Sequence, residues 1–194
     1  MNRQQEEVAV FNRKSLGFWI YLMTDCVLFA TLSTTFAVLR TATAGNVSGH
    51  EIFDLNFVLI ETMILLTSSF TVGLAMLGAE RGFKKQTIFW LVITFLLGAT
   101  FLTMELTEFA KLAQEGHAWS QSAFLSSYFV LVGTHGLHIA VGLLWMAVVT
   151  FRLMQRNFKE TDIRRLSLFS LFWHFLDIIW IFIFSFVYLI GGMA

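Results

Sequence analysis

The stretch WHFLDIIW, residues 173–180, lies inside an apolar run from about Ser167 to Ile190. That run is long enough to cross a lipid bilayer as a helix. Asp177 stands well inside it, where an ionised carboxylate costs on the order of 2.5–3.5 kcal/mol on insertion scales. His174 lies three residues earlier and therefore on the same helix face. Either a His–Asp hydrogen bond fixes this face against another helix, or the pair serves transport or a proton relay. The stretch itself does not separate these readings.

The composition is that of a membrane protein. Of 194 residues, 57% are hydrophobic and only 13% are charged, which is far from the balance of a soluble domain. The formal net charge is zero, so nothing indicates a nucleic-acid partner. The single cysteine, Cys26, excludes an internal disulfide and a cysteine metal cluster. Because there is no proline, no helix is expected to be kinked by one.

Five apolar runs follow a polar segment at residues 1–14, which we expect to be a cytoplasmic tail. Each run is long enough for one span, and no connection is large enough for a soluble domain. The sequence therefore predicts an all-α integral membrane protein, a single membrane domain over residues 15–194 built as a five-helix bundle. The expected helices cover residues of about 15–39, 56–79, 87–110, 122–151 and 167–190.

The distribution of Lys and Arg predicts the orientation of the spans. The N-terminal tail holds three of these residues, the second connection three and the fourth five, whereas the first and third connections hold one each. Cytoplasmic segments are enriched in Lys and Arg. We therefore expect the N-terminus in the cytoplasm and the C-terminus outside.

Four acidic residues fall within the expected spans, and no Lys or Arg does. They are Asp25, Glu61, Glu105 and Asp177. If all four were ionised without partners, the insertion penalty would approach ~10 kcal/mol. They must then be protonated, hydrogen-bonded to His, Ser, Thr or Tyr, or paired with a partner subunit or lipid. Structural packing, proton transfer and partner contact all stay open as roles.

Three histidines in the spans raise the question of a haem or metal site. His135 and His138 are three residues apart on one helix, so at most one of them could share a haem with His174. No cysteine or carboxylate set completes a zinc, copper or iron site. We expect hydrogen-bonded packing positions, and no catalytic, cofactor-binding or metal-binding residue.

Three motifs together resemble subunit III of the haem-copper respiratory oxidases. Residues 173–180 resemble the motif of the last helix in that family, and GTHGLH at 133–138 resembles its His-Gly-Leu-His motif. Glu105 and Glu108 resemble the paired acids that end the preceding helix. Asp25 stands where the mitochondrial form carries a buried, carbodiimide-reactive Glu. The resemblance runs from about residue 16 to residue 191.

Within the family, the sequence is most similar to the five-helix form of the bacterial cytochrome bo-type ubiquinol oxidases, notably in residues 17–26 and 168–180. The resemblance implies a non-catalytic subunit of a proton-pumping oxidase that oxidises quinol and reduces oxygen to water in the bacterial inner membrane. It implies partner subunits I, II and IV, with the haems and copper in subunit I. It also implies bound phospholipid, and a role in stabilising subunit I.

The resemblance leaves specific contacts and alternatives to be examined. The expected structural, lipid or partner contacts are Asp25, Glu61, Glu105, His135, His138, His174, Asp177 and Trp180. The alternatives are a cytochrome c oxidase subunit III, a free-standing haem-binding membrane anchor, and a small proton-coupled transporter. A transporter would be expected to have broken helices or an inverted repeat, and the sequence has no such symmetry.

Overall fold

The computed structural model describes residues 3–39, 55–114, 123–155 and 160–190. Within these residues the chain is helical apart from the turn at residues 81–83, and it has no strands. Five helices are long and apolar enough to cross a membrane, which confirms the predicted fold class. The helices are α1 (Arg3–Leu39), α3 (Leu55–Glu80), α4 (Lys84–Gln114), α5 (Ala123–Gln155) and α6 (Glu160–Ile183), and a π-helical segment, η1 (Phe184–Ile190), continues α6.

Several helices extend beyond the apolar runs that predicted them. α1 begins at Arg3, inside the stretch expected to be a tail, and α6 begins at Glu160 instead of near residue 167. The added turns contain no Gly or Pro and are rich in Arg, Gln, Glu and Lys, which favour helix. Glu160 and Asp162 in the first turn of α6 also interact favourably with the helix dipole. Hydropathy reports where a helix is apolar, and therefore misses its polar ends.

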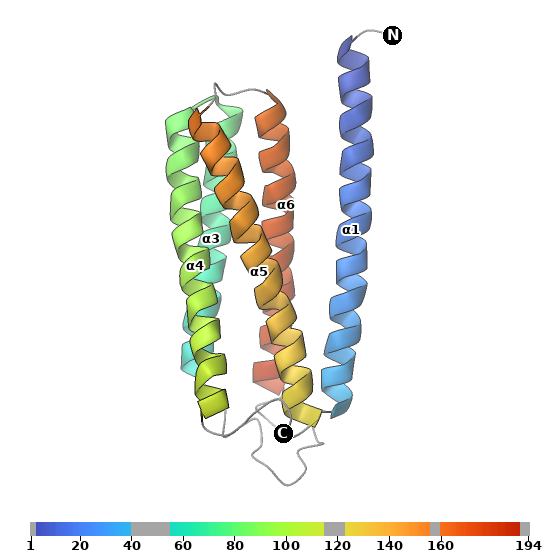
Figure 1. Ribbon diagram of the computed structural model, residues 1–194, viewed down its shortest axis with the longest axis vertical. Helices are drawn as coiled ribbons and strands as arrows, with labels where there is room; N and C mark the ends of the chain where they lie inside the picture. The colour runs from blue at the N-terminus through green and yellow to red at the C-terminus, as the bar shows by residue number, and fades with distance from the viewer. Residues whose placement is uncertain (1–2, 40–54, 115–122, 156–159, 191–194) are drawn as a thin grey trace.

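Four helices form a closed bundle, and the fifth packs on its side (Figure 1). Around the bundle, α3 contacts α4, α4 contacts α5, α5 contacts α6, and α6 returns to α3. α1 packs on α5 and α6, outside this four-helix group. The five helices alternate in direction, so the N- and C-termini lie at opposite ends of the molecule. α6, which carries residues 173–180, therefore contacts three other helices: α1, α3 and α5.

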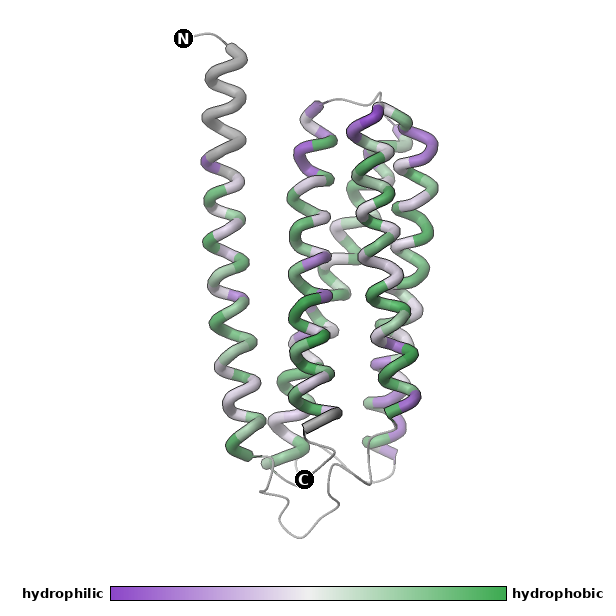
Figure 2. Tube along the Cα trace, turned by 180° about the vertical axis from the view of Figure 1, so that it is seen from behind, coloured by the Kyte–Doolittle hydropathy of each residue, from purple (hydrophilic) through white to green (hydrophobic). Residues whose placement is uncertain are grey.

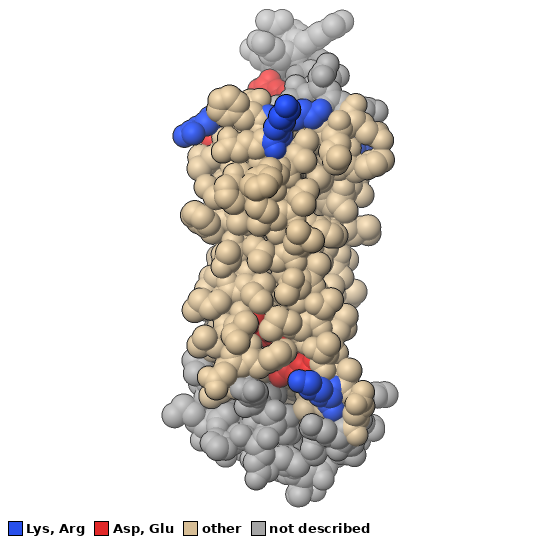
Figure 3. Space-filling model, turned by 90° about the vertical axis from the view of Figure 1, so that its left-hand side faces the viewer, with Lys and Arg blue, Asp and Glu red and all other residues tan. Residues whose placement is uncertain are grey.

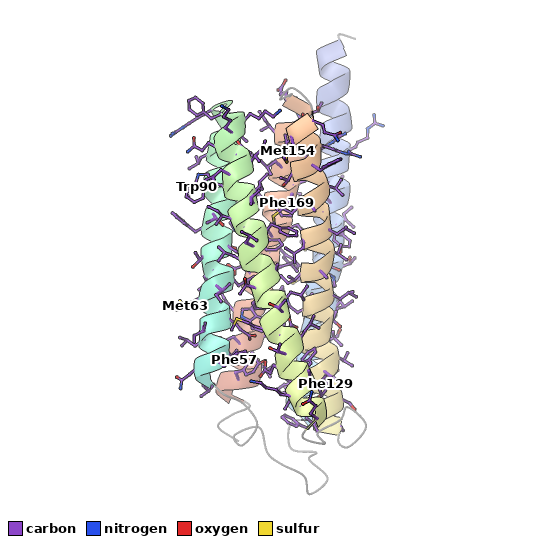
Figure 4. The ribbon with its side chains drawn as sticks, turned by 60° about the vertical axis from the view of Figure 1, so that its left-hand side comes forward. Phe57, Met63, Trp90, Phe129, Met154 and Phe169 are labelled. Carbon is purple, nitrogen blue, oxygen red and sulfur yellow. The ribbon has the colours of Figure 1, made fainter. Side chains whose placement is uncertain are left out.

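The connection between α3 and α4 is a tight turn that depends on a glycine. Gly82 has a φ of 74°, a left-handed conformation that other residues adopt only with strain. The amide of Phe83 donates to the carbonyl of Gly78 at 2.9 Å and closes the end of α3. Next to it, Lys84 Nζ donates to the carbonyl of Met154 at 3.3 Å. This bond ties α4 to the end of α5, at the same end of the molecule (Figure 4).

The surface carries an uncharged belt between two charged ends. Hydrophobic residues dominate the middle of the helices (Figure 2), and the face that shows α3 and α4 has Lys and Arg only near its two ends (Figure 3). Large apolar side chains such as Phe70, Leu96, Leu144 and Ile178 are exposed on this belt. Such a surface is stable in hydrocarbon and would aggregate in water.

Trp173 of α6 holds the middle of the bundle together. Its indole N–H donates to Ser68 Oγ of α3 at 3.0 Å. A methyl group built on Gly98 of α4 would lie 2.9 Å from the Trp173 ring, and one built on Gly142 of α5 would lie 3.1 Å from it. The two glycines therefore supply the space that the indole occupies, and one side chain joins all four helices of the bundle.

Candidate functional site

A second tryptophan layer lies two helical turns further along α6. Trp180 is fully buried and donates its indole N–H to Thr62 Oγ1 of α3 at 3.1 Å. The Phe101 ring of α4 meets it edge-on, with centroids 4.8 Å apart. The His135 ring of α5 stacks on it, with centroids 5.1 Å apart. Trp180, like Trp173, thus joins α6 to α3, α4 and α5, and one of its contacts is the imidazole of His135.

His135 is enclosed by aromatic rings and has no polar partner. Phe29 and Phe101 lie against it edge-on at 6.2 and 6.1 Å between centroids, in addition to the stacked Trp180. The side chain is 0% exposed, and within the described part of the chain neither ring nitrogen has a hydrogen-bond partner. These rings fill the space that a haem would need beside His135.

His174 does not share this position. It lies on α6 six residues before Trp180, a rise of roughly 9 Å along a helix, and it makes no ring contact with His135. The structure therefore does not bring His135 and His174 together as ligands of one haem. Among the residues that the structure describes, no group of three or more His, Cys, Asp or Glu side chains could hold a metal ion.

Two fully buried carboxyl groups adjoin the Trp180 layer. Glu61 of α3 is 0% exposed and Glu105 of α4 is 1% exposed, and none of their four oxygens has a hydrogen-bond partner among the residues that the structure describes. The Glu105 carboxyl lies against Gly136 of α5, where an added Cβ would be 2.7 Å from Oε1. Glu61 and Glu105 are close enough to repel each other electrostatically. The sequence predicted that these acids need partners, and the described residues supply no hydrogen bond to either of them.

A pair of buried tyrosines links this region toward the end of α4. The hydroxyls of Tyr128 on α5 and Tyr188 on η1 are hydrogen-bonded at 3.0 Å. Tyr188 in turn donates to Glu108 Oε2 at 3.4 Å. Glu108 is partly exposed and lies one turn beyond Glu105 on α4. Sequence reasoning missed the tyrosines, because a buried phenol has no distinctive spacing; a Tyr inside an apolar run was the available signal.

Asp25 of α1 faces His138 of α5. Asp25 Oδ2 lies 3.6 Å from His138 Nε2, within ion-pair range but beyond a direct hydrogen bond. His138 Nδ1 is 2.7 Å from the carbonyl oxygen of Thr134, which can only accept. Nδ1 must therefore carry a hydrogen, and in the neutral ring Nε2 is an acceptor. The carboxyl of α1 and the imidazole of α5 thus form a polar contact between the two helices.

Asp177, the acid of the last-helix motif, faces α3 instead of pairing with its own helix. It interacts with Ser69 of α3 and with His174. However, Asp177 Oδ1 and Ser69 Oγ have no hydrogen-bond partner, and no hydrogen bond joins His174 to Asp177. The local His–Asp bond that the spacing allows is thus not formed, and His174 is only partly buried.

We expect replacement of Asp25 to depend on hydrogen-bonding capacity more than on charge. Asp25→Leu replaces the carboxyl beside His138 Nε2 with an apolar side chain and should lower the unfolding free energy by about 1–3 kcal/mol. Asp25→Asn should lower it less, because an amide N–H can donate to Nε2. SDS titration of the chain within its complex would measure both effects. Equal losses for Asn and Leu would show that the Asp25–His138 contact contributes nothing.

These features define a class: an all-helical membrane bundle with buried acids, whose tryptophans join its helices. Comparison with known proteins specifies it further. Residues 3–192 match the family of cytochrome c oxidase subunit III. The chain belongs to this family.

Three relatives illustrate how the family is represented. The chain is 56% identical to subunit 3 of the cytochrome bo(3) ubiquinol oxidase of Pseudomonas aeruginosa, over 91% of this chain and 85% of the relative. It is 47% identical to quinol oxidase subunit 3 of Bacillus subtilis, over 91% and 86%. It is 44% identical to cytochrome c oxidase subunit 3 of Bacillus sp. strain PS3, over 92% and 86%. Membership agrees with the resemblance carried by residues 133–138 and 173–180.

Proposed function

We propose that this chain is the non-catalytic subunit III of a proton-pumping terminal quinol oxidase, which couples quinol oxidation to the reduction of oxygen to water. The carrying observation is its 56% identity, over 91% of its length, to a subunit named for a ubiquinol oxidase. The 44% identity to a cytochrome c oxidase subunit supports the alternative electron donor. Ubiquinol and reduced cytochrome c, offered separately to the purified complex, distinguish the two.

In this proposal the redox centres lie in a partner. Subunit I carries the haems and copper, and subunits II and IV complete the assembly. Electron transfer needs a bound cofactor, and the described histidines of this chain offer no paired axial ligands. His135 is enclosed by three aromatic rings, and His138 is engaged by Thr134 and Asp25. The chain contributes shape and stability to the complex.

Lipid binding is part of the same proposal. A groove of about 340 Å³ opens between α1 and α5, near the end where α1 finishes and α5 begins. Its volume and apolar character fit an acyl chain of a phospholipid. Its lining residues are Leu32, Thr35, Leu39, Ala123, Ser126, Ser127 and Val130.

The orientation in a bacterial inner membrane is proposed from the charge distribution. Arg81, Lys84 and Lys85 lie at the α3–α4 end of the bundle, which we place in the cytoplasm. A membrane-impermeant thiol reagent applied from outside should then label Gly49→Cys and Gly192→Cys, which lie outside the described residues, but not Lys85→Cys. Labelling of Lys85→Cys with protection of Gly192→Cys would reverse the topology. The native Cys26 is replaced by serine in all three variants.

Deletion of the chain tests the proposed role. An oxidase complex expressed without it should keep the full haem absorbance per subunit I and part of its initial activity. It should assemble in lower yield or lose activity during turnover, because a stabilising subunit is missing. Stoichiometric loss of a haem on deletion would assign a redox centre to this chain and contradict the proposal.

A further inference from the structure

Six unpartnered polar atoms gather in one layer of the bundle. They are the four carboxyl oxygens of Glu61 and Glu105 and the two ring nitrogens of His135. Thr62, which follows Glu61, binds the indole on which His135 stacks. Gly136, which follows His135, contacts the Glu105 carboxyl. The three side chains come from three different helices, α3, α4 and α5, and are essentially unexposed. Their unpartnered polar atoms lie at one level of the bundle.

The charges around this layer do not balance. Among the described residues, Glu61 acts electrostatically on Glu105, and Glu108 acts on both. All three of these groups are acids. The titratable groups that face them are His135 and Tyr128 of α5 and Tyr188 of η1, and on the α1 side the Asp25–His138 pair lies beyond His135. Two buried carboxylates that repel each other, with no cation beside them among the described residues, cannot both stay ionised in an apolar interior.

We propose that Glu61 and Glu105 form a buried proton-binding site, whose proton exchanges with the end of the bundle at which Glu108 lies. The donor–acceptor inventory indicates this ligand. Ionised carboxyls only accept hydrogen bonds, and a neutral imidazole offers a single N–H. The layer is therefore rich in acceptors and poor in donors, and a protonated carboxyl supplies the missing O–H. Neither a haem-copper centre nor a subunit contact requires this arrangement, so the site is separate from the proposed function.

The tyrosine pair provides the connection. Tyr188 donates to Glu108 Oε2, which leaves its oxygen to accept from Tyr128 at 3.0 Å. Tyr128 interacts electrostatically with Glu61, Glu105 and Glu108, and its hydroxyl lies beyond direct hydrogen-bond distance of the two buried carboxyls. A phenol both donates and accepts, so a proton that reaches Tyr128 can pass through Tyr188 to Glu108 without a net change in either tyrosine. It ends at Glu108, the one partly exposed carboxyl of the group.

Infrared spectroscopy of the complete oxidase complex tests the site. The difference spectrum of wild type minus Glu61→Gln/Glu105→Gln at neutral pH should contain the C=O stretching band of a protonated carboxyl. The matched control, Glu80→Gln at the exposed end of α3, should show ionised carboxylate bands only. Unchanged haem absorbance of each complex verifies assembly. If the double-variant difference shows carboxylate bands alone, no proton is bound and the proposal fails.

Exchange kinetics test the route by a separate measurement on the wild-type site. After dilution into D₂O, the protonated-carboxyl band should shift as deuterium replaces the proton. Tyr188→Phe, which removes the hydroxyl between Tyr128 and Glu108, should slow this shift severalfold. Tyr21→Phe on the exposed face of α1 should leave the rate unchanged. Equal rates in both variants, or a band that never exchanges, would overturn the proposed connection.

Discussion

Gly98→Ala should prevent α6 from seating fully in the bundle. The added methyl would lie 2.9 Å from two atoms of the Trp173 ring and 3.0 Å from Leu143 Cδ2. An indole is rigid, and this one is also held by its bond to Ser68, so it cannot move aside without breaking that bond. Overpacking of this kind typically lowers stability by about 1–3 kcal/mol. We expect the upper part of that range, measured by SDS titration of the chain in its complex.

Gly73→Ala is the matched control for that substitution. It makes the same chemical change in a neighbouring helix, α3, but nothing lies within 4 Å of its Cβ position. It should be neutral or slightly stabilising, because alanine favours helix over glycine. If Gly98→Ala and Gly73→Ala behave alike, Trp173 does not depend on the space at Gly98. The packing described for the middle of the bundle would then be wrong.

Trp180→Ala should be still more damaging. It removes the stacked partner of His135, the ring that Phe101 meets edge-on and the donor to Thr62. Replacing a buried Trp by Ala costs about 3–5 kcal/mol in soluble proteins. In a membrane the association of helices rests on such packing and on interhelical hydrogen bonds. The cavity left by the indole would therefore weaken the interactions that hold the helices together. We expect the complex to lose this chain in mild detergent.

Two further variants separate packing from hydrogen bonding at this position. Trp180→Phe retains an aromatic ring but loses the indole N–H. The fraction of complexes that keep this chain in mild detergent should therefore lie between those of wild type and Trp180→Ala. Trp19→Ala truncates an exposed indole of α1. It should have little effect on the packing of the bundle. Retention of the chain by the complex in Trp180→Ala would contradict the central place given to this layer.

The number of spans could be predicted because a bilayer imposes a length and an apolar composition on each helix. The helix ends could not, since polar helix formers extend α1 and α6 beyond the apolar runs. Likewise, an acid in a span predicts a need for partners but does not name them. Asp25 meets His138 across two helices, and only tertiary packing determines that contact.

The glycines make the same point. Gly136 leaves the space that the Glu105 carboxyl occupies. Gly73 on α3 has open space at its Cβ position. The positions that accommodate Trp173 are Gly98 and Gly142, which no local pattern distinguishes from the others. A large side chain on one helix and a glycine on another become complementary only when their depths are known.

The measurement that tests the central claim most directly is the composition and absorbance of what purifies with this chain. An affinity tag on the chain, extracted in mild detergent, should retain a larger haem-copper subunit and further oxidase subunits, identified by native mass spectrometry. Dissociation of that complex should leave the chain colourless and all haem with the larger subunit. A chain that purifies without these partners and carries a stoichiometric Soret band of its own would contradict the account.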